Sequence, residues 1–459
     1  MRPKLRSAVG ALVVLLLASL VSAANPASAG RDRHRELRPV IFVHGGAGSG
    51  AQFETQAMRL TSNGYPASLI AVHEYDSTFG LNTMEQVWIG LDALIVRMLD
   101  ESGADQVDLL GHSLGTTVSH GYLTSSPERA ARVAHYVNID GRTAASPPGG
   151  VDTLAVWGEG DQTRAIVGAQ NHYAPDQAHV EVATSAETFA QFYEFFTGRP
   201  PRTTDVVPEP PGRVRLSGEA NIFPQNVGSA GSTLQIWEVD GDTGERRGRR
   251  PKATFEIGTD GAWGPFNANG RKHYEFALSR SDGSTHHFYF QPFLRSDHLV
   301  RLLTSVPGQG LDLLREASDD HTGIGITRYK EMWGDQGALD DVLEIDGTNV
   351  LNPATAPRTK RVNAMFAFDH DIDGVTDLSA PVAAWFALPF ISATDLFIPA
   401  AIPPDRTIEV KMIARAGDGD VEVLNIPNWA SSGHIVTLQF RDFQQAADRW
   451  PWHRGHNHR

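Results

Sequence analysis

Apolar residues follow two patterns in the N-terminal part of the chain. Residues 39–44, 107–110 and 133–139 form nearly continuous apolar runs, which are typical of strands buried on both faces of a parallel sheet. Between such runs, apolar residues recur every three or four positions, as on one face of a helix. The clearest helical segment starts at Thr83 with a capping box and stops at Gly103. Its predicted core face consists of Met84, Val87, Trp88, Leu91, Ile95 and Met98.

The alternation of strands and helices predicts the fold class of this part. Further strands at 68–75 and 154–157, and helices at 52–63 and 185–196, continue the alternation. It favours a mostly parallel, doubly wound α/β sheet. Ligands of such sheets bind outside the carboxyl ends of the strands, so functional residues are expected in the loops that follow strands.

The pattern changes beyond the proline-rich segment 199–212, which we interpret as an extended linker. Short alternating strands separated by Gly and Asp turns predict an all-β region. Residues 273–279 and 285–290 flank Ser281-Asp282-Gly283, which is a strong hairpin signal. The part at 213–310 resembles transthyretin-like or carboxypeptidase-regulatory sandwiches.

The predicted organisation therefore has five segments. They are a signal peptide at 1–29, an α/β domain at 30–198, the linker at 199–212, a β-sandwich at 213–310, and a second β unit with the tail at 311–459. The all-β part is expected to consist of two sandwich-like or barrel-like units.

The first residues carry the features of a secretory signal peptide. Three basic residues precede the apolar run 8–21, and small residues before Ala23 and Ala29 offer two cleavage sites. An uncleaved membrane anchor is the alternative, but the run is short for spanning a bilayer. With no other long apolar run, the mature chain is expected to be secreted and to lack a transmembrane segment.

Charge and cysteine content narrow the classes of function. The 459 residues carry a net charge of −14, and removal of the predicted signal peptide makes the chain still more negative. Such a charge disfavours a nucleic-acid partner, because the phosphate backbone would be repelled. The chain has no cysteine, which excludes a cysteine nucleophile, thiolate zinc sites and iron–sulfur chemistry.

The sequence Gly111-His112-Ser113-Leu114-Gly115 has the G-x-S-x-G spacing of a nucleophile elbow. It follows a strand-like run and precedes a helix-like run, which is the context that such an elbow requires. Ser113 would then be exposed at a sharp turn, and the amide of Leu114 would lie at a helix N-terminus, where it can meet an anion. An ordinary β-to-α turn that contains Gly and Ser is the alternative.

A second glycine-rich loop, residues 44–50, follows the first strand. A phosphate-binding loop would need a Gly-Lys-Ser/Thr ending, which is absent, and a dinucleotide fingerprint would need a helix that opens directly after the glycines as well as an acidic residue on the next strand. We therefore interpret the loop as one wall of an oxyanion hole, with the amides of Gly46 and Leu114 as donors.

An elbow serine needs a histidine base and an acid, in the chain order Ser, Asp/Glu, His. Asp161 follows the strand 154–157, and His179 follows later, before the helix 185–196. We predict that Ser113 attacks an acyl carbon, that His179 moves the proton, and that Asp161 orients His179. The rivals for these roles are His73 and His172 for the base, and Asp140, Asp152 and Asp176 for the acid.

These motifs together resemble those of the α/β-hydrolase lipases. Residues 41–46 are similar to the oxyanion strand of that family, 99–115 to the segment leading into the elbow, and 179–185 to its histidine loop. The resemblance implies a minimal α/β-hydrolase, since no room remains for the usual leading strands or for a large lid. With the long β region, the chain resembles extracellular two-domain lipases of archaea and actinobacteria.

In those lipases the β region lies near the active site and helps with lipid substrates. A passive stabilising or attachment domain is the alternative for the present chain. The resemblance implies a secreted serine carboxylic-ester hydrolase, a triacylglycerol lipase or long-chain esterase, whose chemistry needs no cofactor. A polyester depolymerase, an acyltransferase, or a non-catalytic binding protein with an inactive hydrolase domain are the alternatives. The expected partner is an acyl-ester lipid.

One acidic segment suggests a cation site. Asp369, Asp371, Asp373 and Asp377 alternate with other residues around Gly374, as in the first half of a calcium loop. The Glu that closes an EF-hand is missing, so a structural Ca²⁺ site outside a helical hand is one interpretation. An acidic turn without metal is the other.

Overall fold

The computed structural model describes residues 37–415 and 421–444. The predicted signal peptide at 1–29 and residues 445–459 of the predicted tail lie outside the described residues. Within the described ranges, no helix combines the length and the apolar character needed to cross a bilayer.

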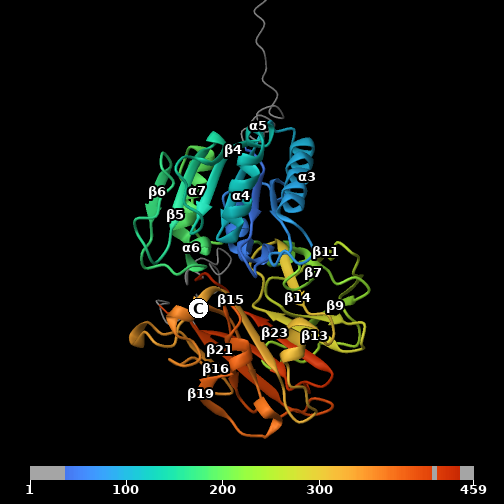
Figure 1. The fold of residues 1–459 in the computed structure, drawn as a ribbon. Helices are drawn as coiled ribbons and strands as arrows, with labels where there is room; N and C mark the ends of the chain where they lie inside the picture. Colours follow the sequence, from blue (N-terminus) through green and yellow to red (C-terminus); the bar gives the residue numbers. More distant parts are fainter. Residues whose placement is uncertain (1–36, 416–420, 445–459) are drawn as a thin grey trace, which may run out of the picture. The chain divides into compact units, whose positions relative to one another are not determined.

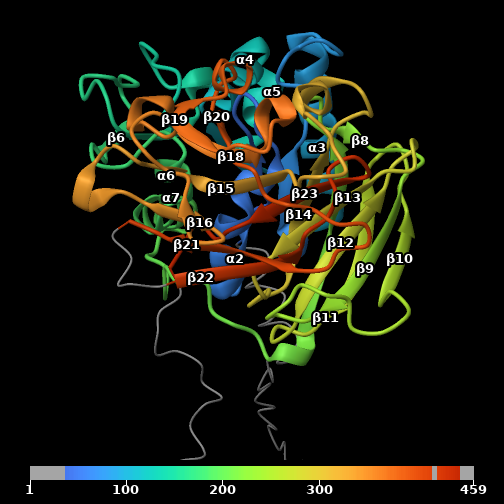
Figure 2. The ribbon, with the colours of Figure 1, turned by 90° about the horizontal axis from the view of Figure 1, so that it is seen from below.

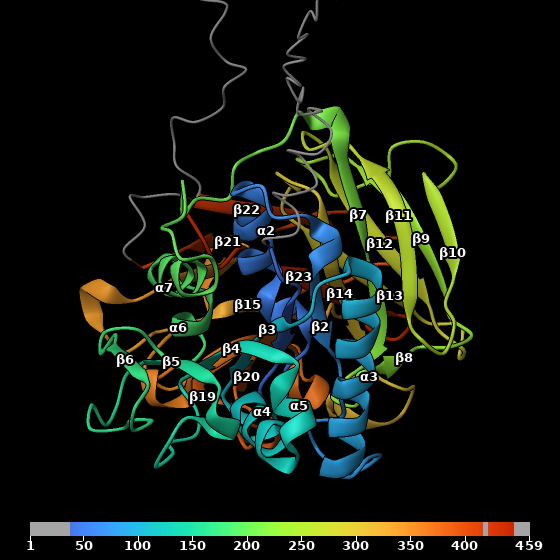
Figure 3. The ribbon, with the colours of Figure 1, turned by 90° about the horizontal axis from the view of Figure 1, so that it is seen from above.

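The N-terminal part is a six-stranded parallel sheet with the strand order β2-β1-β3-β4-β5-β6. Its helices cover both faces, with α2 against α7 on one side and α3 against α4 on the other (Figure 3). The strands are β1 (Val40–Val43), β2 (Ile70–His73), β3 (Val107–His112), β4 (Val133–Ile139), β5 (Asp152–Trp157) and β6 (Gln170–Tyr173). The helices are α2 (Glu54–Ser62), α3 (Met84–Ser102), α4 (Leu114–Ser125), α5 (Pro127–Ala131), α6 (Glu181–Thr184) and α7 (Ala186–Thr197).

The predicted elements of this part are confirmed with small shifts of their ends. The central strands are fully buried, as continuous apolar runs require. Helix α3 begins after Thr83, whose side chain accepts from the amide of Gln86 while the Gln86 side chain accepts from the Thr83 amide. The helix ends at Gly103, which has a left-handed φ of 71° that favours glycine.

The C-terminal part is almost entirely β (Figures 1 and 2). A nine-stranded sheet has the order β10-β9-β12-β13-β23-β15-β18-β20-β19, and two four-stranded sheets contain β11, β7, β14 and β8, and β17, β16, β21 and β22. The strands of residues 213–310 are β7 (Val214–Ile222), β8 (Val227–Gly228), β9 (Thr233–Val239), β10 (Ala253–Glu256), β11 (Ala262–Ala268), β12 (His273–Ser279), β13 (Thr285–Phe290) and β14 (Asp297–Thr304). Those beyond are β15 (Ile324–Met332), β16 (Val342–Ile345), β17 (Thr348–Asn349), β18 (Val362–Phe368), β19 (Asp377–Pro381), β20 (Ile391–Asp395), β21 (Thr407–Ile413), β22 (Val421–Pro427) and β23 (His434–Gln439), with the short helix α8 (Ala383–Phe386).

The predicted hairpin is confirmed, because β12 and β13 pair antiparallel around residues 281–283. The two predicted β units, in contrast, share one sheet. Strand β13 of the first unit pairs in parallel with β23, the last strand of the second. Each unit keeps an apolar core of its own, but the backbone hydrogen bonds of the large sheet cross the predicted boundary at 310.

The β region packs against the carboxyl ends of the parallel strands, since β14 contacts α2 and the 3₁₀ turn Gly50–Phe53 while β15 contacts α6. Buried Arg301 of β14 lies 2.7 Å from Glu74 and 3.3 Å from Glu219. Burial acts to raise the pKa of the Glu74 carboxyl, but the charge of Arg301, the nearby His44 and the hydrogen bonds from Arg301 and the Gly50 amide together hold the pKa below its usual value. The predicted linker lies along α2, where Thr203 and Thr204 accept side-chain hydrogen bonds from Asn63 and Arg59.

Removal of the α3 cap should lower stability without changing the fold. Replacing Thr83→Ala deletes the oxygen that accepts from Gln86, and such losses cost about 1 kcal/mol of unfolding free energy. Urea unfolding followed by circular dichroism measures this change. The variant Thr83→Ser keeps the acceptor and should unfold at the wild-type urea concentration; an equal loss in both variants would contradict the assignment.

Candidate active site

Ser113 lies between β3 and α4 with φ 52° and ψ −121°, a strained conformation for a residue with a side chain. The flanking glycines are required sterically. A Cβ atom on Gly111 would lie 2.7 Å from the carbonyl oxygen of Gly115, and one on Gly115 would lie 2.2 Å from that of Val43. The turn therefore has the geometry that the sequence predicts for a nucleophile elbow.

His179 is paired with Asp140, which directly follows β4. The imidazole Nδ1 lies 2.6 Å from Asp140 Oδ2, and both side chains are buried. The other carboxylate oxygen accepts from the amide of Gly158 and lies 2.9 Å from Arg164 Nη1. Burial acts to raise the pKa of Asp140, but the hydrogen bond from His179 and the charges of His179 and Arg164 outweigh it and lower the pKa.

The prediction that Asp161 is the acid partner is wrong. Asp161 is exposed, and its Oδ1 accepts from the amide and the hydroxyl of Thr163, at 2.8 and 2.7 Å. The turn that contains Asp161 thus already supplies hydrogen-bond donors to its carboxylate, whereas Asp140 faces the histidine loop. Both aspartates follow a parallel strand, so their place in the chain could not separate them. Among the described residues, no hydrogen bond joins another rival to this pair: His172, Asp152 and Asp176 are exposed, and His73 bonds to the carbonyl of Val87.

A second histidine, His112, is hydrogen-bonded to the backbone of His179. His112 Nε2 lies 2.8 Å from the carbonyl oxygen of His179, and its Nδ1 is bonded to the side-chain amide of Gln52. Burial lowers the pKa of His112 to about 3, so this ring is neutral. A neutral ring that donates from Nε2 and accepts at Nδ1 fits both partners.

Ser113 and His179 line one cavity of about 70 Å³, together with residues 45–48 of the glycine-rich loop. Because His179 donates from Nδ1 to Asp140, its Nε2 is the ring's acceptor. No hydrogen bond between described residues engages the Ser113 hydroxyl or the Gly46 amide. Leu114 is the first residue of α4, so its amide has no acceptor within the helix. Gly46 and Leu114 are adjacent, since a Cβ on Gly46 would lie 3.7 Å from a Leu114 methyl.

The β region holds the glycine-rich loop. The side-chain amide of Asn226 donates to the carbonyl oxygens of Gly48 and Tyr75, at 2.8 and 3.2 Å. The Gly50 amide donates to Glu74, which in turn is bound to Arg301. Sequence reasoning gave no role to Asn226 or Arg301, because their contacts join segments far apart in the chain.

The four aspartates of the predicted calcium loop do not converge. Asp369 accepts from the Gly374 amide, Asp373 from that of Val375, and Asp377 from that of Ser379. In the described part of the chain, the group suited to hold a metal ion is Glu316, His370 and Asp371, which shares one member with the predicted set. The predicted ligand set is therefore wrong, and binding of calcium stays a prediction.

The pairing of His179 predicts which aspartate activates Ser113. Asp140→Asn should slow labelling of Ser113 by a fluorophosphonate about 10⁴-fold, because the amide favours the wrong histidine tautomer. Asp161→Asn is the matched control and should label at the wild-type rate. Time courses of probe incorporation measure both. Slow labelling of the Asp161 variant alone would reverse the assignment.

Three family models match successive parts of the chain. The model described as alpha/beta hydrolase fold matches residues 38–206, and the model described as Lipase C-terminal domain matches residues 212–307. A third, described as a C-terminal domain, matches residues 310–444.

Solved structures give a weaker likeness. Lipase B of Aspergillus fumigatus is 15% identical, with 37% of this chain and 54% of that chain covered and a TM-score of 0.30. A predicted CIB-like hydrolase from Thermoplasma acidophilum is also 15% identical, with 35% and 87% covered and a TM-score of 0.27. By its matched models and its parallel sheet, the chain is an α/β hydrolase of the lipase and esterase type with a C-terminal domain.

Proposed function

We propose that this hydrolase cleaves carboxylic esters of long-chain acyl groups, as a triacylglycerol lipase or long-chain esterase does. The observation that carries the proposal is an apolar cavity that adjoins the Ser113–His179 cavity. The substrate would be an acyl-ester lipid, and the predicted export of the chain agrees with an extracellular substrate.

The geometry suits an acyl-enzyme mechanism. Ser113 Oγ bonds to the acyl carbon while His179 Nε2 takes the hydroxyl proton, and the amides of Gly46 and Leu114 stabilise the oxyanion. The bond to the alcohol oxygen then breaks, and His179 gives its proton to that leaving group. Water repeats the sequence in the second half-reaction and releases the acid. Asp140 holds the histidine tautomer and stabilises the imidazolium throughout.

The apolar cavity of about 160 Å³ lies within the β region. It shares Ala47, Tyr329, Asn363 and Phe390 with the cavity that Ser113 lines. Its wall is mostly aromatic and aliphatic, including Phe223, Phe288, Leu303, Leu311, Phe366, Trp385 and Ile391. An alkyl chain buried there gains about 0.8 kcal/mol for each methylene removed from water, so the cavity favours long acyl chains.

Phe390 lies where the two cavities meet. Its ring stacks on His179 with ring centroids 6.0 Å apart and planes within 9°. An acyl group bonded to Ser113 would therefore leave the reacting centre past an apolar ring, which suits an alkyl chain better than a polar one.

Filling the apolar cavity should reduce turnover of long esters selectively. Ala364 lines this cavity, and Ala364→Phe removes the room for an alkyl chain. We expect kcat/KM for p-nitrophenyl palmitate to fall about 10–100-fold, since lost contacts of one or two methylenes are worth that much. The value for p-nitrophenyl butyrate should change less than about twofold by the same reasoning.

The exposed alanine of β11 offers a matched control. Ala262→Phe adds the same ring outside the cavity and should leave both esters unaffected. Equal loss on both esters in Ala364→Phe, or no loss on either, would contradict binding of the acyl chain in the β region.

A further inference from the structure

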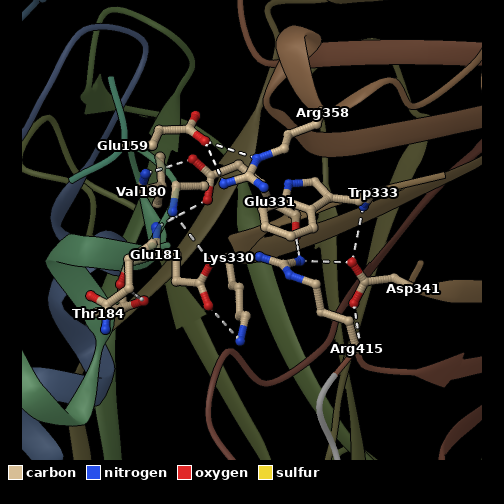
Figure 4. A network of polar contacts seen from close by, with 12 residues as sticks. Glu159, Val180, Glu181, Thr184, Lys330, Glu331, Trp333, Asp341, Arg358 and Arg415 are labelled. Atoms are coloured by element: carbon tan, nitrogen blue, oxygen red, sulfur yellow. Dashed lines mark hydrogen bonds and ion pairs between the residues drawn. The ribbon is translucent and has the colours of Figure 1, made fainter. Parts of the chain in front are cut away.

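Glu331 is a carboxylate that the β region buries beside the histidine loop. It lies near the end of β15, and its side chain is fully buried. Its Oε1 accepts from the amide of Val180 at 2.6 Å, and its Oε2 accepts from the amide of Glu181 at 3.0 Å (Figure 4). Both amides directly follow His179 in the chain.

These two hydrogen bonds suit an ionised carboxylate, because each oxygen accepts from one donor and a proton on either would face an amide N–H. Burial raises the pKa of Glu331, while the two amides and the nearby His179 act against that shift. A buried carboxylate keeps its charge only where such donors replace water, and here the donors are the backbone of the histidine loop.

One peptide unit is thereby held at both ends. The carbonyl of His179 and the amide of Val180 belong to the same planar peptide group. The carbonyl oxygen accepts from His112 of the α/β sheet at 2.8 Å, and the N–H donates to Glu331 of the β region. Fixing both ends of this plane restricts ψ of His179 and φ of Val180, and so the direction in which the imidazole of His179 projects.

Further contacts keep Glu331 and the loop in place. Arg415 donates to the backbone carbonyl of Glu331 and lies 2.6 Å from the carboxylate of Glu181. The guanidinium of Arg415 is also bound to buried Asp341, at 2.7 Å. Lys330 lies 2.8 Å from the second oxygen of Glu181, so the carboxylates of Glu181 and Glu331 both have partners (Figure 4).

We propose that Glu331 is a positioning residue for His179, so that the β region completes the catalytic geometry as well as binding substrate. This inference rests on the proposed ester hydrolysis. Glu331 acts through the backbone of the histidine loop, and its negative charge also favours the imidazolium that forms during reaction. Other groups near His179 are Asp140, His112 and, behind Asp140, Arg164.

The first test replaces the carboxylate in the full-length chain. Glu331→Gln keeps the shape but loses the charge and one acceptor. We expect kcat for p-nitrophenyl butyrate to fall about 10–100-fold with KM within about twofold, because a small misplacement of a catalytic group has that effect. The acid limb of the kcat/KM profile should move to lower pH, which a purely structural role would not produce.

Glu331→Asp separates charge from reach. It keeps the charge but is one methylene shorter, so kcat should fall while the acid limb stays at the wild-type pH. Glu275→Gln is the matched control, since Glu275 is an equally buried carboxylate of β12, paired with Arg246 and His287. It should reduce thermal stability and leave kcat and the pH profile of the folded enzyme unchanged.

Amide hydrogen exchange on the wild-type chain tests the contact without any variant. The amides of Val180 and Glu181 should exchange as slowly as those of β15. Exchange as fast as in the exposed turn at 160–164 would overturn the proposal, as would a folded Glu331→Gln variant with wild-type kcat. A wild-type chain that hydrolyses no ester would instead refute the proposed function, and slow exchange at these amides would still be expected.

Discussion

The buried hydrogen bond between His179 and Asp140 is the interaction on which the site depends. It joins the loop after β4 to the loop before α6, at the carboxyl edge of the parallel sheet. Removing two such groups from water is costly unless each finds partners. Asp140 accepts from the Gly158 amide and pairs with Arg164, so its negative charge stays beside His179, where it would stabilise an imidazolium.

The β region is bound to both loops that border the cavity. Asn226 and Arg301 hold the glycine-rich loop, directly and through Glu74, and Glu331 holds the loop of His179. Tyr329, Asn363 and Phe390 contribute to the wall of the same cavity. The α/β part thus supplies Ser113, Asp140 and His179, whereas the region beyond residue 212 contributes part of the wall around them.

Buried ionic networks are weak evidence for stability, because desolvation can cancel the attraction between the charges. Arg301 with Glu74 and Arg415 with Asp341 are therefore better understood as devices that fix geometry. Each joins segments that lie far apart in the chain. The cost is acceptable because nearly every atom of these groups has a charged or backbone partner.

The error at Asp161 shows why a site is harder to predict than a sheet. Asp140 and Asp161 both follow parallel strands, and both were candidates. What separates them is the direction of a side chain after a turn: Asp140 has a left-handed φ of 41° and points to His179, while Asp161 closes its own turn with Thr163. The predicted set of calcium ligands was wrong for the same reason, since backbone amides of local turns bind Asp369, Asp373 and Asp377 one by one.

The sequence alone determined the order of strands and helices, the cap at Thr83, the hairpin at 281–283 and the elbow at Ser113. These features depend on residues close together in the chain, so periodicity and glycine positions are sufficient to predict them. Only the tertiary structure decided the pairing of His179 with Asp140, the sheet shared by the two β units, and the contact of Glu331 with the histidine loop. Those depend on long-range packing, whose partners lie too far apart in the chain for any local pattern to record.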